Sequence, residues 1–137
     1  MTRHDGVFPA RMDAFPRVAA LVESAAGAAG FAAADAMRLR LVVEELFTNT
    51  VAHGHGADSE APVRVTLDSA PGRVAVTYED TAPPFDPRTR APAADPATLR
   101  AGGLGLVLVT RFARELSYAR VGDANRIALV IERAGTP

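Results

Sequence analysis

Two pairs of short alternating segments constrain the fold of this chain more than any other feature of its sequence. Apolar and polar residues alternate over residues 62–68 and 73–79, and a turn containing proline and glycine separates these two runs. A second pair covers residues 117–121 and 126–132. Alternation with period two predicts half-buried strands, and short polar connections predict hairpins. A further short strand is expected over residues 6–10.

Three other segments have the apolar spacing of helices, namely residues 13–29, 35–53 and 103–115. Strands that are joined as hairpins favour a mixed, mostly antiparallel sheet, and the helices must then cover one of its faces. We therefore expect an α+β fold, built as a two-layer α/β sandwich. With 137 residues, the chain is expected to form a single domain over residues 1–137.

The composition excludes several classes of function. The net charge is −1 and no basic segment dominates, which argues against direct binding to DNA. Every Lys/Arg position is an arginine, so no lysine can hold a phosphate or form a Schiff base. There is no cysteine, which excludes disulfides and thiolate metal sites. Because no apolar run approaches the roughly 18 residues of a membrane span and no signal core begins the chain, a cytoplasmic protein without a membrane partner is expected.

A polar stripe interrupts the predicted helix over residues 35–53. Glu45, Asn49 and His53 recur every four residues and so share one helix face. An asparagine oxygen suits Mg²⁺, and a carboxylate one turn away can orient or deprotonate a water or a hydroxyl group. The same stripe is also compatible with a solvated face that carries a carboxylate–imidazole pair. Glu44 lies about 100° around the helix from Glu45, so only one of the two can join Asn49.

Two further segments have a possible chemical role. Asp80 follows the predicted strand over residues 73–79, where a carboxylate can accept a hydrogen bond from an exocyclic amine or can simply begin a turn. Gly102-Gly-Leu-Gly-Leu106 opens the last predicted helix, where backbone N–H groups attract phosphate. A hinge or a tight contact between helix and sheet would also explain these glycines. The segment is not a P-loop, because no Gly-Lys-Ser/Thr is present.

In this order and spacing the motifs match a known family. The chain resembles the bacterial anti-sigma factor serine/threonine-protein kinases of the switch-protein type, within the gyrase/heat-shock chaperone/histidine-kinase/MutL (GHKL) ATPase superfamily. The resemblance rests on Glu45 to Asn49 with His53-Gly54, on Asp80 with Ala82 and Pro84-Phe-Asp-Pro87, on Gly102 to Leu106, and on the ending that starts at Asn125.

The resemblance implies a Bergerat-type ATP-binding fold with ATP and Mg²⁺ as cofactors. Asn49 would ligate Mg²⁺, and Glu45 would be the general base for the serine of a protein substrate. Asp80 would bind the adenine amino group, and residues 88–101 would form the ATP lid. The remaining nucleotide contacts implied by the family are His53, Ala82, Phe85, Gly102, Gly103, Leu104, Gly105 and Leu106.

The resemblance also implies partners: a kinase that phosphorylates an anti-anti-sigma (STAS-type) protein, sequesters a sigma factor and commonly forms a homodimer. Ala82 departs from the pattern, which has glycine there. If this position needs a positive φ or close contact with adenine, a methyl group disfavours it by about 1–2 kcal/mol. That departure favours the alternative of a non-enzymatic partner-binding module with weak or lost ATP binding. Pro84-Phe-Asp-Pro87 speaks against the catalytic domain of a split histidine kinase.

Overall fold

The structure, a computed structural model, describes residues 1–89 and 104–134. Five strands form one sheet in the order β1-β2-β3-β5-β4. Their bounds are β1 Thr2–Pro9, β2 Pro62–Ala70, β3 Arg73–Asp80, β4 Arg114–Val121 and β5 Ala124–Glu132. All neighbouring strands are antiparallel. The expected α+β fold and its hairpins are therefore confirmed, with a sheet that is antiparallel rather than mixed across the described residues.

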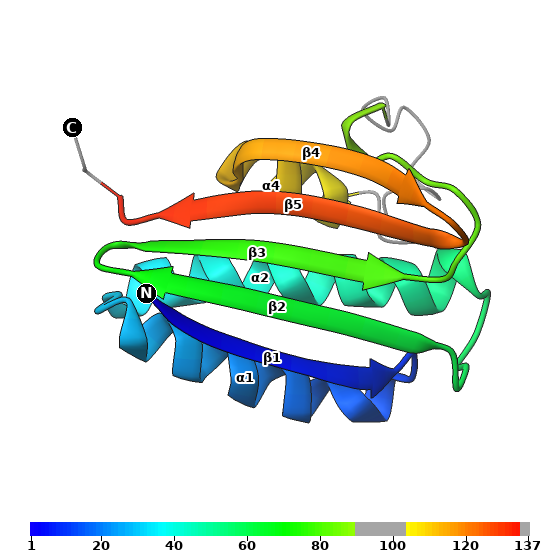
Figure 1. The fold of residues 1–137 in the computed structure, drawn as a ribbon, viewed down its shortest axis with the longest axis horizontal. Coiled ribbons are helices and arrows are strands. Elements are labelled where there is room, and N and C mark those ends of the chain that lie inside the picture. Colours follow the sequence, from blue (N-terminus) through cyan, green and yellow to red (C-terminus); the bar gives the residue numbers. More distant parts are fainter. Residues whose placement is uncertain (90–103, 135–137) are drawn as a thin grey trace.

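The helices within the described ranges all lie on one face of this sheet (Figure 1). Helix α1 (Phe15–Ala28) follows a short 3₁₀ turn and lies along β1 and β2, whereas α2 (Ala33–Asn49) lies along β3. A π-helical turn, Thr50–Gly54, extends the end of α2. Helix α4 (Leu104–Phe112) lies behind β4 and β5. This arrangement is the predicted two-layer sandwich.

The core fills the space between the helices and the inner face of the sheet. The alternating residues of β2 and β3 are buried as predicted, and apolar residues of α1 and α2 face them. On the outer face, exposed charged side chains form ion pairs such as Arg126–Glu79 at 3.0 Å. The inward set from the strands comprises Val63, Val65, Leu67, Val74, Val76, Tyr78, Ile127, Leu129 and Ile131.

Four elements, β1, α2, β4 and β5, begin earlier than their sequence patterns predict. Strand β4 begins at Arg114 instead of residue 117, so the helix expected over residues 103–115 ends at Phe112 and its last predicted residues pair with β5. Strand β1 starts at Thr2 instead of residue 6, because its backbone pairs with β2 along its full length although its outer side chains are polar. Helix α2 starts at Ala33, and Asp35 lies in its first turn instead of capping it. The Asp35 carboxylate accepts hydrogen bonds from the backbone N–H of Ala134 at 3.0 Å and from Arg38 at 2.7 Å, and these bonds lower its pKa.

Within the described residues, no helix has the length and apolar character needed to cross a membrane.

Candidate functional site

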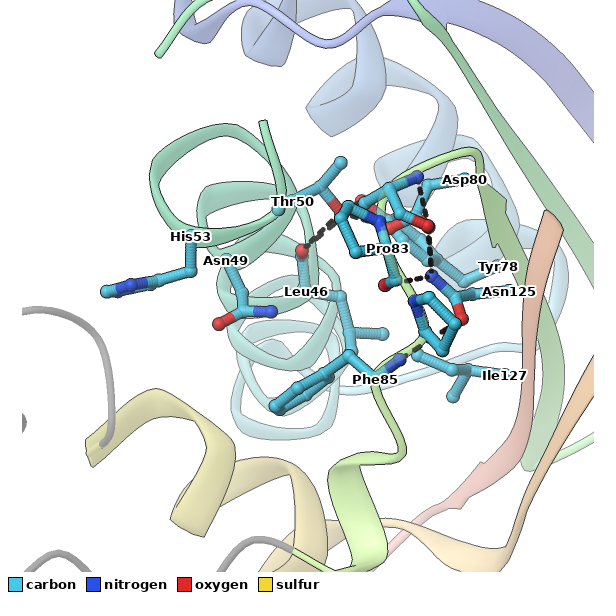
Figure 2. Close-up of a pocket in the computed structure, with 13 residues that line it drawn as sticks. Leu46, Asn49, Thr50, His53, Tyr78, Asp80, Pro83, Phe85, Asn125 and Ile127 are labelled. Atoms are coloured by element: carbon cyan, nitrogen blue, oxygen red, sulfur yellow. Dashed lines mark hydrogen bonds between the residues drawn. The ribbon is translucent and has the colours of Figure 1, made fainter. Parts of the chain in front are cut away.

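A cavity of about 160 Å³ opens where β3 ends and β5 begins, beside the last turns of α2. Five predicted site residues line it: Asn49, His53, Asp80, Ala82 and Phe85. Figure 2 shows Asp80 gathered with its polar partners at one end, whereas Asn49 and His53 lie at the other. The fold therefore brings together two motifs that are about thirty residues apart in the chain. The other lining residues are Leu46, Thr50, Gly54, Tyr78, Pro83, Pro84, Asn125 and Ile127.

The carboxylate of Asp80 is buried, with 7% of the residue exposed. Its Oδ2 atom accepts a hydrogen bond from the Thr50 hydroxyl at 2.7 Å, and its Oδ1 atom accepts one from the Asn125 amide at 2.8 Å. The backbone N–H of Ala82 also donates to Oδ1 at 3.3 Å. A buried charge is tolerated when hydrogen bonds compensate for lost hydration. Because a carboxylate offers about four lone pairs, one acceptor position remains for a ligand that donates an N–H.

The hydroxyl groups of Thr50 and Tyr78 support the carboxylate of Asp80. Their hydroxyl oxygens are 2.6 Å apart, and the Tyr78 oxygen also lies 3.2 Å from the backbone carbonyl of Leu46, so its single proton has two acceptors within reach. Burial raises the pKa of Tyr78 well above its usual value; the charge of Asp80 adds to the rise and the hydrogen bond with Thr50 opposes it. The phenol thus remains a neutral donor. In the sequence, Thr50 and Tyr78 fall on the apolar positions of residues 35–53 and 73–79, so the pattern alone predicts that both lie in the core. Tyr78 nevertheless lies two residues before Asp80 and so shares its strand face.

Asn125 is the main site residue that the motifs do not identify, because in the sequence it marks only the start of an ending similar to the last strand of the family. It is the second residue of β5, with 3% of its surface exposed. Its side-chain nitrogen donates to the carbonyl oxygens of Ala82 and Pro83, at 3.0 and 3.1 Å, as well as to Asp80. One buried amide therefore ties the end of β3 to the turn that follows it.

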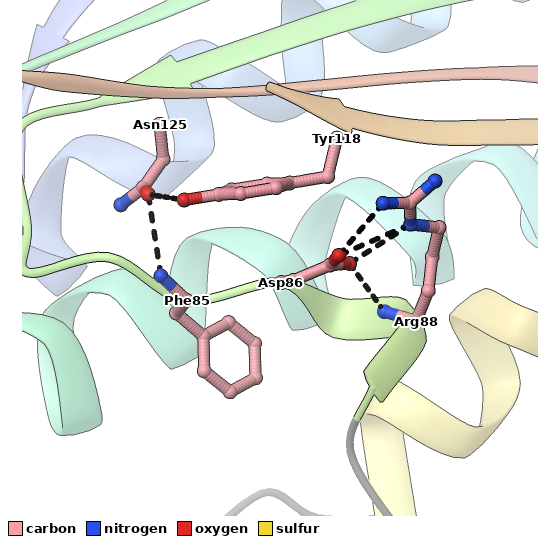
Figure 3. Close-up of polar contacts among 5 residues, drawn as sticks. All are labelled: Phe85, Asp86, Arg88, Tyr118 and Asn125. Atoms are coloured by element: carbon pink, nitrogen blue, oxygen red, sulfur yellow. Dashed lines mark hydrogen bonds and ion pairs between the residues drawn. The ribbon is translucent and has the colours of Figure 1, made fainter. Parts of the chain in front are cut away.

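The oxygen of the same amide holds the next part of this turn (Figure 3). Asn125 Oδ1 accepts hydrogen bonds from the Tyr118 hydroxyl at 2.5 Å and from the backbone N–H of Phe85 at 3.3 Å. Beyond Phe85, the Asp86 carboxylate accepts hydrogen bonds from the Arg88 guanidinium, the shortest at 2.8 Å, and these lower the pKa of Asp86. The Pro-Phe-Asp-Pro motif is thus fixed by side chains on both of its sides.

Ala82 fits its position without backbone strain. Among the described residues other than glycine, only Glu115 has a positive φ, so the strain anticipated for Ala82 is absent. Its methyl group is buried against Gly54, where an added Cβ would lie 2.6 Å from the Ala82 Cβ. Arg120 also donates to the Ala82 carbonyl at 2.8 Å. A glycine on the π turn therefore provides the space that the methyl group needs.

Asn49 has the feature expected of a ligand-binding amide. Its side-chain oxygen is buried and has no hydrogen-bond partner within the described residues. An unsatisfied buried acceptor costs about 1–3 kcal/mol, and a bound donor or a cation would remove that cost. No group of three or more His, Cys, Asp or Glu side chains that could hold a metal ion occurs among the described residues. The site thus fits Mg²⁺, which binds through few protein groups together with waters and phosphates.

The predicted stripe of Glu45, Asn49 and His53 does not continue as a regular α-helix. The π turn is closed by the hydrogen bond from the His55 N–H to the Thr50 carbonyl at 2.9 Å. It presents His53 to solvent, and Figure 2 shows its ring pointing away from Asp80. π turns are rare and occur frequently at functional sites.

Glu45 is half-buried and does not line the cavity. Burial raises its pKa above the usual value, and repulsion by Glu44 raises it further. A carboxylate with a raised pKa is a candidate general base.

The glycine motif is described in part. Gly102, Gly103 and most of the predicted lid over residues 88–101 lie outside the described residues. Leu104, Gly105 and Leu106 form the first turn of α4.

The comparisons with known proteins concern the family and the fold. Residues 8–131 match the sequence model of a family described as a histidine kinase-like ATPase domain, which confirms the resemblance drawn from the motifs. The fold is similar to the crystal structure of the RsbU and RsbW domains of Rv1364c from Mycobacterium tuberculosis. The TM-score is 0.67 at 16% identity, over 96% of this chain and 32% of that chain.

A second similar structure is the Acinetobacter baumannii histidine kinase AdeS, with a TM-score of 0.47 at 13% identity, over 98% of this chain and 70% of that chain. It is too distant to support an argument. No curated protein sequence matches the chain. At these identities the solved structures establish the fold alone, and this chain spans about a third of the Mycobacterium tuberculosis chain.

Proposed function

The chain belongs to the family of histidine kinase-like ATPase domains, and from this premise we propose that it is an ATP-dependent serine kinase that acts as an anti-sigma factor. ATP would bind in the cavity between Asp80 and Asn49. The observation that carries the proposal is the pairing, in one cavity, of two buried groups. One is a carboxylate that has one free acceptor position, and the other is an amide oxygen that has no partner among the described residues.

The Asp80 end of the cavity suits a purine base that carries an amino group. Asp80 can accept one further N–H, and Thr50 and Asn125 prevent its carboxylate from turning away. Leu46 and Ile127 are buried apolar walls of the same cavity. The site would therefore recognise an adenine through one hydrogen bond within an otherwise apolar surface. This combination is typical of cofactor sites.

The Asn49 end suits the phosphates and Mg²⁺. The Asn49 oxygen would be one hard ligand of the ion, and the first turn of α4 would offer its N–H groups to the phosphates. When bound, Mg²⁺ neutralises the charge that develops on the transferred phosphoryl group. Glu45, one helical turn before Asn49, would orient the serine hydroxyl of the protein substrate and accept its proton.

The proposed partners are an anti-anti-sigma protein, as the substrate, and a sigma factor. Two observations support them: the Pro84-Phe-Asp-Pro87 motif, which is held in place by Asn125 and Arg88, and the shared fold with a protein described as having RsbU and RsbW domains. The second candidate is a partner-binding module of the same fold without catalysis. It is favoured by the position of Glu45 outside the cavity lining.

Calorimetric titration with ATP, with and without Mg²⁺, tests the nucleotide site. We expect micromolar, Mg²⁺-dependent binding that Asn49→Ala abolishes. Equal ATP affinity in Asn49→Ala and wild type would refute the metal assignment. No binding at millimolar ATP would favour the partner-binding module.

Phosphotransfer to purified anti-anti-sigma proteins from the same genome tests catalysis. Glu45→Ala should retain ATP binding and lose transfer, whereas the adjacent control Glu44→Ala should keep both. Loss of transfer in Glu44→Ala, with transfer retained in Glu45→Ala, would show that Glu44 and not Glu45 is the general base.

A further inference from the structure

A second polar cavity, of about 230 Å³, lies at the opposite end of the sheet from Asp80. Arg38 from α2, Arg111 from α4, Arg114 from β4, and Glu132 and Arg133 at the end of β5 line it. Asn125 is the second residue of β5 and Glu132 is its last, so these two lining residues are about 24 Å apart along the strand at roughly 3.4 Å per residue. Figure 1 shows that β5 stops and α2 starts at the same end of the sheet.

The acidic groups near this cavity are already engaged. Arg38 donates to the Asp35 carboxylate at 2.7 Å and to the backbone carbonyl of Glu132 at 2.8 Å. The Glu132 carboxylate lies 3.7 Å from Arg73, which also pairs with Glu115 at 3.0 Å. Counted over the described residues, the five arginines of this region thus carry two more positive charges than its three acidic residues can neutralise.

Two of the arginines have no partner of their own. Arg111 and Arg114 are exposed, and neither guanidinium has a hydrogen bond or ion pair within the described part of the chain. Arg133 is held beside them by the turn between β2 and β3. Its backbone N–H donates to the Gly72 carbonyl at 3.0 Å, and its guanidinium occupies the space that a side chain at residue 72 would fill.

We propose that this cavity is a binding site for a phosphate dianion, either free or as a monoester on a ligand. A guanidinium cannot lose its proton in a protein, so the excess charge persists at every physiological pH. Its planar fork of donors matches the oxygens of phosphate. A phosphate group of about −1.5 to −2 charges at pH 7 would neutralise the excess of the cluster. This site is independent of the proposed nucleotide site, because it uses none of the same residues.

The test is a titration of the wild-type protein with inorganic phosphate at constant ionic strength, followed by NMR of backbone and arginine N–H signals. We expect saturable shifts at residues 111–114 and 132–134. Acetate at the same concentration should produce none that saturate. O-phosphoserine is a second arm: binding tighter than that of inorganic phosphate would identify a monoester as the ligand, and weaker binding would identify the free anion.

The double variant Arg111→Gln/Arg114→Gln should raise the dissociation constant for phosphate at least tenfold, since hydrogen bonds to charged groups contribute about one order of magnitude each. Both residues are exposed, so an unchanged thermal unfolding curve is expected. Arg64→Gln, an exposed arginine of β2 outside this cavity, is the matched control and should bind as wild type does. Wild-type affinity in the double variant, or shifts confined to residues 49–54 and 80–85, would overturn the proposal whatever the affinity for ATP.

Discussion

Replacing Asn125 by alanine tests whether one amide holds the site together. The substitution removes an amide whose two N–H groups lie within hydrogen-bond distance of three acceptors and whose oxygen accepts two hydrogen bonds. It leaves Asp80 Oδ1 without its shortest hydrogen bond and Pro83 without its amide donor. Each buried polar group that loses its partner costs about 1–3 kcal/mol. We expect Asn125→Ala to lower the free energy of unfolding by about 3–4 kcal/mol, within the range of severe single substitutions.

Urea unfolding followed by circular dichroism at 25 °C measures this change. A domain of this size typically has about 5–15 kcal/mol of stability, so the variant should remain folded in water. The urea midpoint should fall while the slope of the transition stays constant, since the surface exposed on unfolding is the same. Arg126→Ala, one residue along β5, removes only an exposed ion pair with Glu79 and should cost less than about 1 kcal/mol.

The nearly isosteric Asn125→Asp separates shape from hydrogen bonding. It would set a second carboxylate about where the amide nitrogen lies, 2.8 Å from Asp80 Oδ1. Two carboxylates at this separation share a proton, so the pair binds one more proton in the folded state than in the unfolded state. The destabilisation should therefore shrink as the pH falls from about 8 to about 5. Two results would show that the hydrogen bonds of Asn125 do not hold the turn. One is a loss of unfolding free energy in Asn125→Ala no larger than that in Arg126→Ala, and the other is a stability of Asn125→Asp that does not depend on pH.

Three further changes test other contacts of the site. Gly54→Ala should lower stability by about 1–3 kcal/mol, because its Cβ would crowd that of Ala82. Adding Ala82→Gly should recover at least half of the loss in a urea double-mutant cycle, and strictly additive effects would contradict the contact. Thr50→Val should cost about 1–3 kcal/mol in urea because Asp80 loses a donor, whereas Thr50→Ser should retain most of the stability. If Glu45 is the base, the rate of phosphotransfer should rise with pH through a pKa above the usual glutamate range, since the base must be ionised. In a pH–rate profile Glu44→Gln should move the inflection to lower pH, and an unmoved inflection would contradict the repulsion between the two carboxylates.

The sequence predicted the elements wherever the apolar signal was strong. The alternation in β2 and β3 gave both strands and their buried faces, and the helical stripe of α2 gave the helix. The first half of β1 was missed, because its backbone bonds to β2 decide its length and its side chains carry no apolar pattern. The π turn after Asn49 was also missed, since the period of residues 45–53 reads as a continuous α-helix.

Asn49 and Asp80, which the motifs single out, line one cavity, but the motifs do not identify the groups that hold them. Thr50 and Tyr78 read as core residues, and their hydroxyl groups gain a role only because the end of α2 packs against the end of β3. Asn125 is forty-five residues after Asp80, and only the antiparallel pairing of β3 with β5 makes them partners.

What the sequence by itself determined is local: the periods that make strands and helices, and the residue types with a chemistry suited to a nucleotide. The tertiary structure decided which side chains meet. It placed Gly54 beside Ala82. Because Gly54 has no side chain, there is room for the methyl group of Ala82, which stands where the family pattern has glycine. It also gathered arginines from α2, α4, β4 and β5 into one cavity, although the chain has no basic segment. Both results have the same physical cause: contacts between residues far apart in sequence are fixed by strand pairing and helix packing, which no local pattern contains.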